Sequence, residues 1–197
     1  GLRQIDAADA DLGKSQVARP AAQLLQLQQR ERFMTLQNHP EILGSRLIHW
    51  PAEADTEASA RRLAATPALR DAFIELHGPL GAGKTTFVRH LLRALGVAGR
   101  IKSPSYAVLE PHEARGLAIS HFDFYRFEDP REWEDAGFRD VFAEAGLKLV
   151  EWPEKARGLM PAPDLSLELL VREDDSRLVT LRAHSAIGLQ LLEALAP

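Results

Sequence analysis

The chain has 197 residues, of which 45% are hydrophobic and 26% charged, which is the usage of a globular protein. Its formal net charge is −4 and it contains no cysteine, which excludes a strongly basic nucleic-acid binder, a disulfide framework, a thiolate zinc site and a cysteine nucleophile. No apolar run reaches the ~18 residues that a membrane span needs, and the N-terminus lacks the apolar stretch of a signal peptide. We therefore expect a cytoplasmic protein with one domain and an appendage.

Residues 1–33 differ in composition from the rest of the chain. Glutamine is frequent there, and no aromatic residue precedes Phe33. Three interpretations of this N-terminal extension remain open: the segment is flexible, translation starts at Met34 and the upstream residues are not native, or the segment is a functional arm. We expect the globular domain to span residues 34–197.

The rest of the sequence alternates between helical and strand patterns. In the first half, apolar spacing and turn residues predict a helix at 56–65 with Thr56 as its N-cap, a strand at 72–76, a helix at 84–95, and strands at 106–109 and 117–122 joined by a polar turn. In the second half they predict an interrupted helix at 130–145, a strand at 147–150, a hairpin of strands at 165–171 and 177–181, and a closing helix at 185–194. This mixture predicts a mixed sheet and not an all-parallel one.

The loop between the predicted strand at 72–76 and the next helix carries a phosphate-binding motif. Residues 78–85 read Gly-Pro-Leu-Gly-Ala-Gly-Lys-Thr and fit G-x-x-x-x-G-K-[ST] without a mismatch. In such a loop, backbone N–H groups and the helix N-terminus point at phosphate oxygens, Lys84 reaches the β- and γ-phosphates, and the Thr85 hydroxyl ligates Mg²⁺. The flanking strand and helix disfavour the alternative of a glycine-rich turn that binds nothing. The sequence therefore predicts an α/β, P-loop NTPase-like three-layer fold with a mixed, mostly parallel central sheet.

Two carboxylates are candidate partners for the metal ion. Asp123 follows the predicted strand at 117–122, and Glu151 follows the one at 147–150. Strands that end on a carboxylate place it at the carboxyl edge of the sheet, where phosphates bind in this architecture. Either residue is suited to hold Mg²⁺ or to orient an attacking water, whereas the alternatives are a turn cap and a surface ion pair. No N-K-x-D element for guanine is present, which favours ATP.

Further polar and aromatic residues flank these motifs. The segment Lys102-Ser103-Pro104-Ser105-Tyr106 offers hydroxyl groups and a cation for a switch-like loop that senses the γ-phosphate, or is a simple proline turn. Trp152 is either a cover of the site or core filling. His77, His121 and His184 lack metal-ligand spacing and are interpreted as structural. The basic residues after the loop form a solvated helix face or contact RNA or an acidic partner.

Four sequence blocks together carry a family resemblance. They are Leu-Gly-Ala-Gly-Lys-Thr-Thr-Phe at 80–87, Lys-Ser-Pro-Ser-Tyr at 102–106, His-Phe-Asp-Phe-Tyr-Arg at 121–126 and Val-Glu-Trp-Pro at 150–153. In this order and spacing they resemble the bacterial TsaE (YjeE) family over roughly residues 47–192. The chain departs from the family pattern at Ser105, where a threonine is usual, and at Phe124, where a leucine is usual.

The resemblance implies a function in tRNA modification. Members of this family are small Mg²⁺-dependent ATPases needed to make threonylcarbamoyladenosine, the modified base beside the anticodon. They act with the TsaB–TsaD pair, in which TsaD transfers the threonylcarbamoyl group from an adenylate made by TsaC, and their ATP hydrolysis resets the complex. We accordingly expect a cytoplasmic ATP hydrolase that is monomeric when alone, binds TsaB–TsaD, and contacts tRNA, if at all, through that complex.

The resemblance also assigns residues. Lys84 binds phosphate, Thr85 and Glu151 hold Mg²⁺, Asp123 supports the metal or the water, and Thr56 lies near the nucleotide. The residues expected around ATP are those of the loop and the first turn of its helix, together with that threonine: Gly78, Leu80, Gly81, Ala82, Gly83, Lys84, Thr85, Thr86 and Thr56. Lys84, Glu151 and Asp123 are the expected catalytic residues, and Arg126 is the nearest candidate for an arginine finger.

Two other functions remain open on the sequence alone. A small P-loop kinase would transfer phosphate to a metabolite, but it needs a basic lid over the phosphates, and no arginine-rich insertion is present. An ATP-gated binding module would clamp a partner without turnover.

Overall fold

The structure is a computed structural model that describes residues 40–195. The expected extension at 1–33 and the start of the expected domain lie outside the described residues. The helices are α2 (Glu53–Ala64), α3 (Lys84–Leu95), α4 (Pro130–Asp135), α5 (Phe138–Ala143) and α6 (Ala186–Ala194). The strands are β1 (Gly44–Trp50), β2 (Phe73–His77), β3 (Leu109–Ala114), β4 (Leu117–Asp123), β5 (Leu147–Glu151), β6 (Leu165–Val171) and β7 (Arg177–Ala183), and short 3₁₀ helices cover Pro67–Asp71 and Pro153–Ala156.

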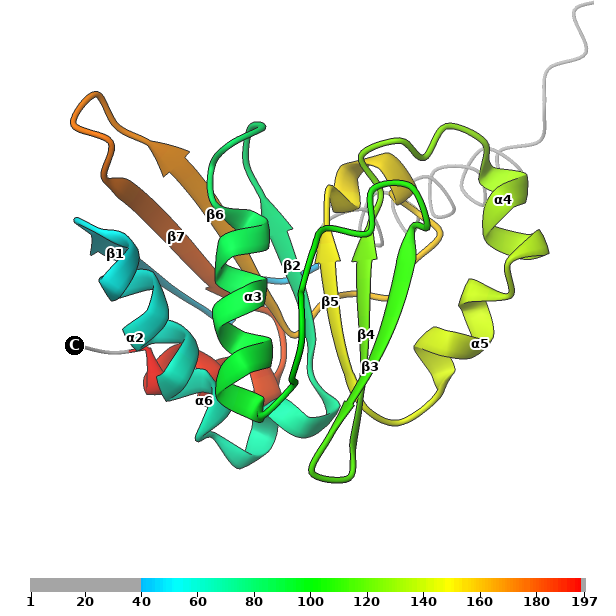
Figure 1. The fold of residues 1–197 in the computed structure, drawn as a ribbon, viewed down its shortest axis with the longest axis horizontal. Coiled ribbons are helices and arrows are strands. Elements are labelled where there is room, and N and C mark those ends of the chain that lie inside the picture. Colours follow the sequence, from blue (N-terminus) through cyan, green and yellow to red (C-terminus); the bar gives the residue numbers. More distant parts are fainter. Residues whose placement is uncertain (1–39, 196–197) are drawn as a thin grey trace, which may run out of the picture. The chain divides into compact units, whose positions relative to one another are not determined.

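The strands form one mixed sheet in the order β1-β7-β6-β2-β5-β4-β3 (Figure 1). The central strands β6, β2, β5 and β4 pair in parallel, whereas β1, β7 and β3 join by antiparallel pairing at the two sides. The prediction of a mixed α/β sheet is confirmed. Parallel strands lie in the centre because they need cover on both faces, which antiparallel edges do not.

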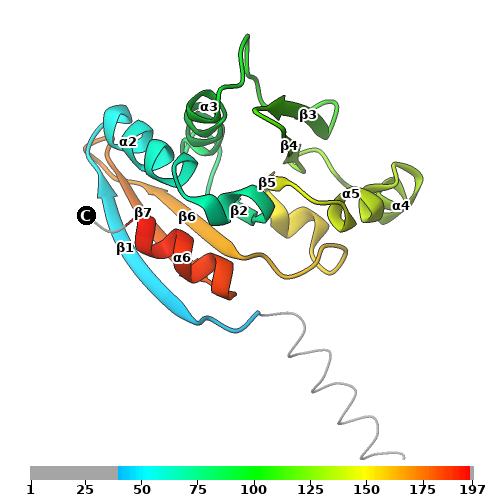
Figure 2. The ribbon, with the colours of Figure 1, turned by 90° about the horizontal axis from the view of Figure 1, so that it is seen from below.

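Helices cover both faces of this sheet. The apolar side chains of α2, α3 and α6 pack with one face in a cluster that includes Leu63, Leu91 and Leu191. The other face of β4 and β5 carries an aromatic cluster in which Phe122 packs against Phe138 and Phe142 of α5, and Trp133 of α4 packs against the same two rings. Figure 2 shows α3 and the α4–α5 pair on opposite sides of β4 and β5. None of the helices within residues 40–195 has the length and hydrophobicity to cross a bilayer.

Most predicted elements are confirmed, but the strand predicted at 106–109 is wrong. The observed strand β3 covers Leu109–Ala114 and includes most of the stretch predicted as a polar turn. Val108 has a left-handed φ of 64°, which ends the preceding turn. Because β3 is the edge strand beside β4, Pro111 and Glu113 are exposed, and Pro111 costs no ladder hydrogen bond. An edge strand that contains a proline and several polar residues has the sequence pattern of a turn.

Two further differences lie before the phosphate loop. Strand β1 was not predicted, because Leu47 is 60% exposed on its outer face and breaks the apolar alternation. Helix α2 begins three residues earlier than expected, so the assignment of Thr56 as an N-cap is wrong. Ala52 is the N-cap, and its N–H donates to the carboxylate of Asp55 at 2.9 Å. Thr56 is instead buried within the helix.

A charged cluster joins the end of β2 to the segment after β5. The ring of His77 lies 3.2 Å from the Glu75 carboxylate and 3.6 Å from that of Glu154. Burial alone would lower the pKa of His77, but its hydrogen bonds with Glu154 and Glu75 and their negative charges outweigh burial and raise the pKa to about 9. His77 is therefore a cation at neutral pH and ties the two segments together.

This cluster predicts a pH dependence of stability. Because the folded-state pKa of His77 exceeds its ordinary value of 6.5, the native state binds the extra proton. The stabilisation that protonated His77 gives to the folded state is complete below pH 6.5 and is lost as the pH rises towards about 9. Because solvent screens these partly exposed charges, we expect the free energy of unfolding to decrease by only about 1 kcal/mol over this pH range. Urea denaturation at several pH values measures it.

The matched variant is His77→Gln, which cannot titrate. The difference in stability between wild type and this variant should shrink as the pH rises through that window. A difference that stays constant from pH 6 to pH 10 would show that His77 does not carry the charge.

Candidate functional site

The phosphate loop has the backbone that its motif requires. The loop follows β2 and leads directly into α3, which confirms the strand–loop–helix context. Gly78 has φ +133°, and a Cβ at this position would lie 2.4 Å from the backbone oxygen of Leu169. Gly83, the N-cap of α3, has φ +105°. Both conformations are costly for any residue with a Cβ, so two motif glycines are fixed by the fold.

Lys84 occupies the first position of α3 and folds back over the loop. Its Nζ donates hydrogen bonds to the backbone oxygens of Gly78 and Pro79 at 2.6 and 2.9 Å. The same ammonium group lies 4.0 Å from the ring centre of Trp152, a favourable cation–π distance. Burial lowers the pKa of Lys84, while the negative charges of Glu151, Glu154 and Asp123 act in the opposite direction. The lysine is thus held by two neutral carbonyl oxygens and an aromatic ring.

Strand register brings the two predicted carboxylates to the same place. Glu151 pairs with Leu76 of β2 on one side and with Asp123 of β4 on the other. The side chains of Glu151 and Asp123 are only 2% and 3% exposed. They therefore depend on hydrogen bonds to protein atoms.

Those hydrogen bonds come from hydroxyl groups of the predicted motifs. Glu151 Oε2 accepts from the Thr85 hydroxyl at 2.8 Å, which joins the strand end to the phosphate loop. Asp123 Oδ2 accepts from Ser105 at 2.7 Å and also from Ser103. Asp123 Oδ1 accepts from the backbone N–H of Tyr125 at 2.9 Å. The 102–106 segment is thereby tied to the same carboxylate that ends β4.

A pocket of about 220 Å³, here called the carboxylate pocket, collects most of the predicted residues. Its walls are Leu80, Gly81, Gly83, Lys84, Thr85, Thr86, Ser103, Ser105, Asp123, Tyr125, Glu151 and Trp152. Lys84 is the one cationic side chain among these described residues. Trp152 forms part of the wall.

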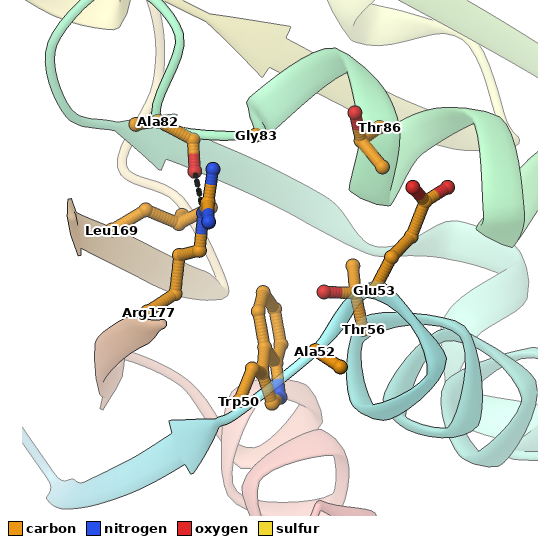
Figure 3. A pocket seen from close by; sticks show the side chains of 9 residues that line it. All are labelled: Trp50, Ala52, Glu53, Thr56, Ala82, Gly83, Thr86, Leu169 and Arg177. Atoms are coloured by element: carbon orange, nitrogen blue, oxygen red, sulfur yellow. Dashed lines mark hydrogen bonds between the residues drawn. The ribbon is translucent and has the colours of Figure 1, made fainter. Parts of the chain in front are cut away.

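A second pocket, the Trp50 pocket, adjoins it on the other side of the start of α3. It measures about 140 Å³ and shares Gly83 and Thr86 with the carboxylate pocket. The remaining lining residues are Trp50, Ala52, Glu53, Thr56, Ala82, Leu169 and Arg177. Figure 3 shows Arg177 against the carbonyl of Ala82, to which its Nε donates at 3.2 Å. Thr56 and Ala82, expected near the nucleotide, lie here.

Some predicted residues lie away from both pockets. Lys102 and Tyr106 line neither of them. Tyr106 is 86% exposed, and the guanidinium of Arg126 stacks 4.4 Å from its ring centre. Arg126, the candidate arginine finger, is therefore engaged with an exposed tyrosine in this conformation. Gly78 contributes through its carbonyl group, which accepts from Lys84.

Sequence reasoning missed several residues of the site. Trp50 lies at the end of β1 and Arg177 at the start of β7. These two strands are far apart in the sequence, and no motif marks either residue. His121 was interpreted as structural, yet its Nε2 lies 2.9 Å from Glu151 Oε1. Its position two residues before Asp123 in a strand is a signal that could have indicated a shared face.

The residues offer oxygen ligands but no complete metal cage. Within residues 40–195 no group of three or more histidine, cysteine, aspartate or glutamate side chains is arranged to hold a metal ion. The Thr85 hydroxyl and the two carboxylates are hard oxygen donors, which Mg²⁺ prefers. A magnesium ion typically completes such a partial set with substrate phosphates and water.

Comparison with known proteins identifies the family. The family profile described as "Threonylcarbamoyl adenosine biosynthesis protein TsaE" matches residues 50–179. The tRNA threonylcarbamoyladenosine biosynthesis protein TsaE of Haemophilus influenzae is 40% identical over 121 residues, which cover 61% of this chain and 76% of that protein. The protein of the same name from Bacillus subtilis is 34% identical over 129 residues, covering 66% and 80%.

Longer alignments and a solved structure agree with this match. The TsaE protein of Rickettsia bellii is 31% identical over 149 residues, 75% of this chain and 97% of that protein. The crystal structure of YdiB from Bacillus subtilis superposes with a TM-score of 0.62 at 25% identity and covers 79% of this chain and 96% of that chain. Since the profile spans the phosphate loop, both strand-end carboxylates and most of the sheet, the chain belongs to the TsaE family.

Proposed function

We propose that this protein is a Mg²⁺-dependent ATPase that acts in the biosynthesis of threonylcarbamoyladenosine in tRNA. The observation that carries the proposal is the hydrogen bond between Thr85 of the phosphate loop and Glu151 at the end of β5. It joins a phosphate-binding loop to a buried carboxylate, the pairing on which metal-assisted phosphoryl chemistry relies. The names of the relatives supply the pathway.

The two adjoining pockets suit the two halves of a nucleotide. The carboxylate pocket contains the loop and Lys84 and would take the phosphates. The Trp50 pocket begins at the same turn of α3 and offers an indole, a hydroxyl and a guanidinium group, which suit a base and ribose (Figure 3). Glycines of the loop would let backbone N–H groups reach the phosphate oxygens.

Lys84 is poised to exchange partners when phosphates bind. Its ammonium group is held by two carbonyl oxygens, which are neutral acceptors. A phosphate oxygen is a charged acceptor and makes the stronger hydrogen bond. Lys84 would therefore leave Gly78 and Pro79 for the β- and γ-phosphates.

The donor set fits Mg²⁺ at the carboxylate pocket. Thr85, Glu151 and Asp123 supply oxygen ligands there, and a single lysine faces the two carboxylates. When bound, Mg²⁺ supplies positive charge that offsets the charge of the phosphates. Asp123 would also orient the attacking water, and its bonds to Ser103 and Ser105 would connect the 102–106 segment to the state of the γ-phosphate.

The resemblance supplies the partners of the proposed ATPase. TsaB–TsaD would bind near the nucleotide and use the hydrolysis cycle as a reset between turnovers. Leu80 and Tyr106 are 74% and 86% exposed, and such exposed apolar groups beside a pocket suit contact with another protein.

Lys84→Ala should weaken ATP binding at least tenfold and abolish hydrolysis, because the charge that meets the phosphates is lost. Calorimetry with ATP and phosphate release measure the two effects, with and without TsaB–TsaD. Lys155→Ala is the control, since Lys155 is exposed and lines neither pocket. Unchanged binding and turnover in Lys84→Ala would contradict the phosphate role.

Glu151→Gln should retain ATP binding and reduce hydrolysis by about a hundredfold or more, because the amide keeps the shape but loses the charge that the metal requires. Steady-state phosphate release at saturating ATP and Mg²⁺ measures the loss. Glu173→Gln, in the exposed turn before β7, controls for the general effect of removing a carboxylate. Full turnover in Glu151→Gln would remove Glu151 from the mechanism.

Ala52→Trp tests the nucleoside half of the site. Ala52 lines the Trp50 pocket from the N-cap of α2, in extended backbone that accepts a large side chain. The indole should fill the pocket and weaken ATP binding about tenfold or more, while tripolyphosphate, which lacks a nucleoside, binds as before. Ala58→Trp, exposed on the same helix, is the control. Equal affinity of wild type and Ala52→Trp for ATP would show that the base does not bind in the Trp50 pocket.

A further inference from the structure

His121 is a buried histidine beside the candidate metal ligands. It lies in β4 two residues before Asp123, so both side chains point to the α3 side of the sheet. The His121 side chain has no exposed surface, and its Nε2 lies 2.9 Å from Glu151 Oε1. A carboxylate accepts hydrogen bonds, so His121 Nε2 carries the proton and donates it.

The bond fixes the direction in which Glu151 points. Glu151 has two oxygens, of which Oε1 accepts from His121 and Oε2 accepts from Thr85 at 2.8 Å. Without His121, rotation about the terminal side-chain bond would cost Glu151 little. With it, Oε2 is held towards the phosphate loop. His121 thus holds the carboxylate by the oxygen that Thr85 does not contact.

The second ring nitrogen of His121, Nδ1, is buried and makes no structural hydrogen bond within residues 40–195. The ring of His112, from the neighbouring strand β3, lies 6.4 Å away at an interplanar angle of 27° and limits its movement. A buried polar atom without a partner is costly. An aromatic hydrocarbon would avoid this cost, so the ring's value lies in the bond to Glu151.

We propose that His121 is a positioning residue that orients Glu151 for Mg²⁺ and nucleotide through the bond from Nε2 to Oε1. The inference rests on the proposed function, because it acts through Glu151. Partners behind a metal ligand typically change metal affinity or activity about 10- to 100-fold when removed. His121 lines neither the carboxylate pocket nor the Trp50 pocket.

The first test compares His121→Phe with His121→Gln. Phenylalanine keeps a planar ring in the core and removes the donor, whereas the glutamine amide can donate close to the original Nε2. Nucleotide affinity is measured by calorimetry with and without Mg²⁺, and hydrolysis is followed during a Mg²⁺ titration. In His121→Phe we expect at least a tenfold rise in the Mg²⁺ concentration for half-maximal hydrolysis and an equal loss of the Mg²⁺-dependent gain in affinity. Affinity without Mg²⁺ should stay within about twofold of wild type, because the loop is unchanged.

His121→Gln should recover most of both losses. Recovery by an amide that packs less well than phenylalanine cannot come from core filling. His112→Phe is the matched control, since it removes an imidazole one strand further from Glu151. It should leave the Mg²⁺ dependence unchanged. Equal Mg²⁺ dependence in wild type and His121→Phe would overturn the proposal, as would equal losses in the Phe and Gln variants.

If His121→Phe does not fold, a second pair of variants, His121→Asn and His121→Gln, tests the same bond. His121→Asn carries the same amide as His121→Gln on a side chain one methylene shorter, which cannot reach Glu151 Oε1. Glutamine should keep the Mg²⁺ dependence and asparagine should lose it, and equal behaviour would overturn the proposal. If the wild type itself shows no Mg²⁺-dependent gain in nucleotide affinity and no hydrolysis, the proposed function fails. If the wild type shows both and the variants match it, only the role of His121 fails.

Discussion

The parallel register of β2, β5 and β4 is the constraint on which the site depends. The phosphate loop leaves the end of β2, and Glu151 and Asp123 end the next two strands of the sheet. Leu76, Glu151 and Asp123 pair across the three strands, so the loop and both carboxylates meet at one edge. Side chains alternate along a strand, and a slip of one residue in either pairing would turn a carboxylate to the opposite face. The packing of β4 and β5 between α3 and the aromatic cluster therefore holds both carboxylates beside the phosphate loop as well as stabilising the fold.

Burial of the carboxylates makes their hydrogen bonds obligatory. An ionised carboxylate removed from water needs partners for its oxygens. Glu151 is bonded to Thr85 and His121, and Asp123 to the two serines of the 102–106 segment and the N–H of Tyr125. Four separate parts of the chain thus supply two hydrogen-bonded groups, one around each carboxylate, beside the phosphate loop. In the proposed function, a change at the phosphates would reach an exposed surface through this segment, because Ser105 is followed by the exposed Tyr106.

The success of the sequence analysis followed the strength of each local signal. The loop at 78–85 and the helix at 84–95 carry motif and periodicity together, and both are confirmed. Edge strands gave weak signals. β1 exposes Leu47 and β3 contains Pro111, so neither has the alternation of a half-buried strand. Thr56 has the side chain of a helix cap, but Ala52 and Asp55 formed the start of α2 instead, because several nearby residues could begin this helix and packing selected one.

Local sequence patterns were sufficient to predict the phosphate loop, the α/β class, the two strand-end carboxylates and the family resemblance, because each of these rests on residues that are close in the chain. Tertiary structure alone decided which distant residues join them. Trp50 and Arg177 lie 127 positions apart yet are paired directly across β1 and β7 and line one pocket with the phosphate loop. His121 and Glu151 are 30 positions apart and share a buried hydrogen bond. Strand order and register create such contacts, and a single sequence does not encode them as a local pattern.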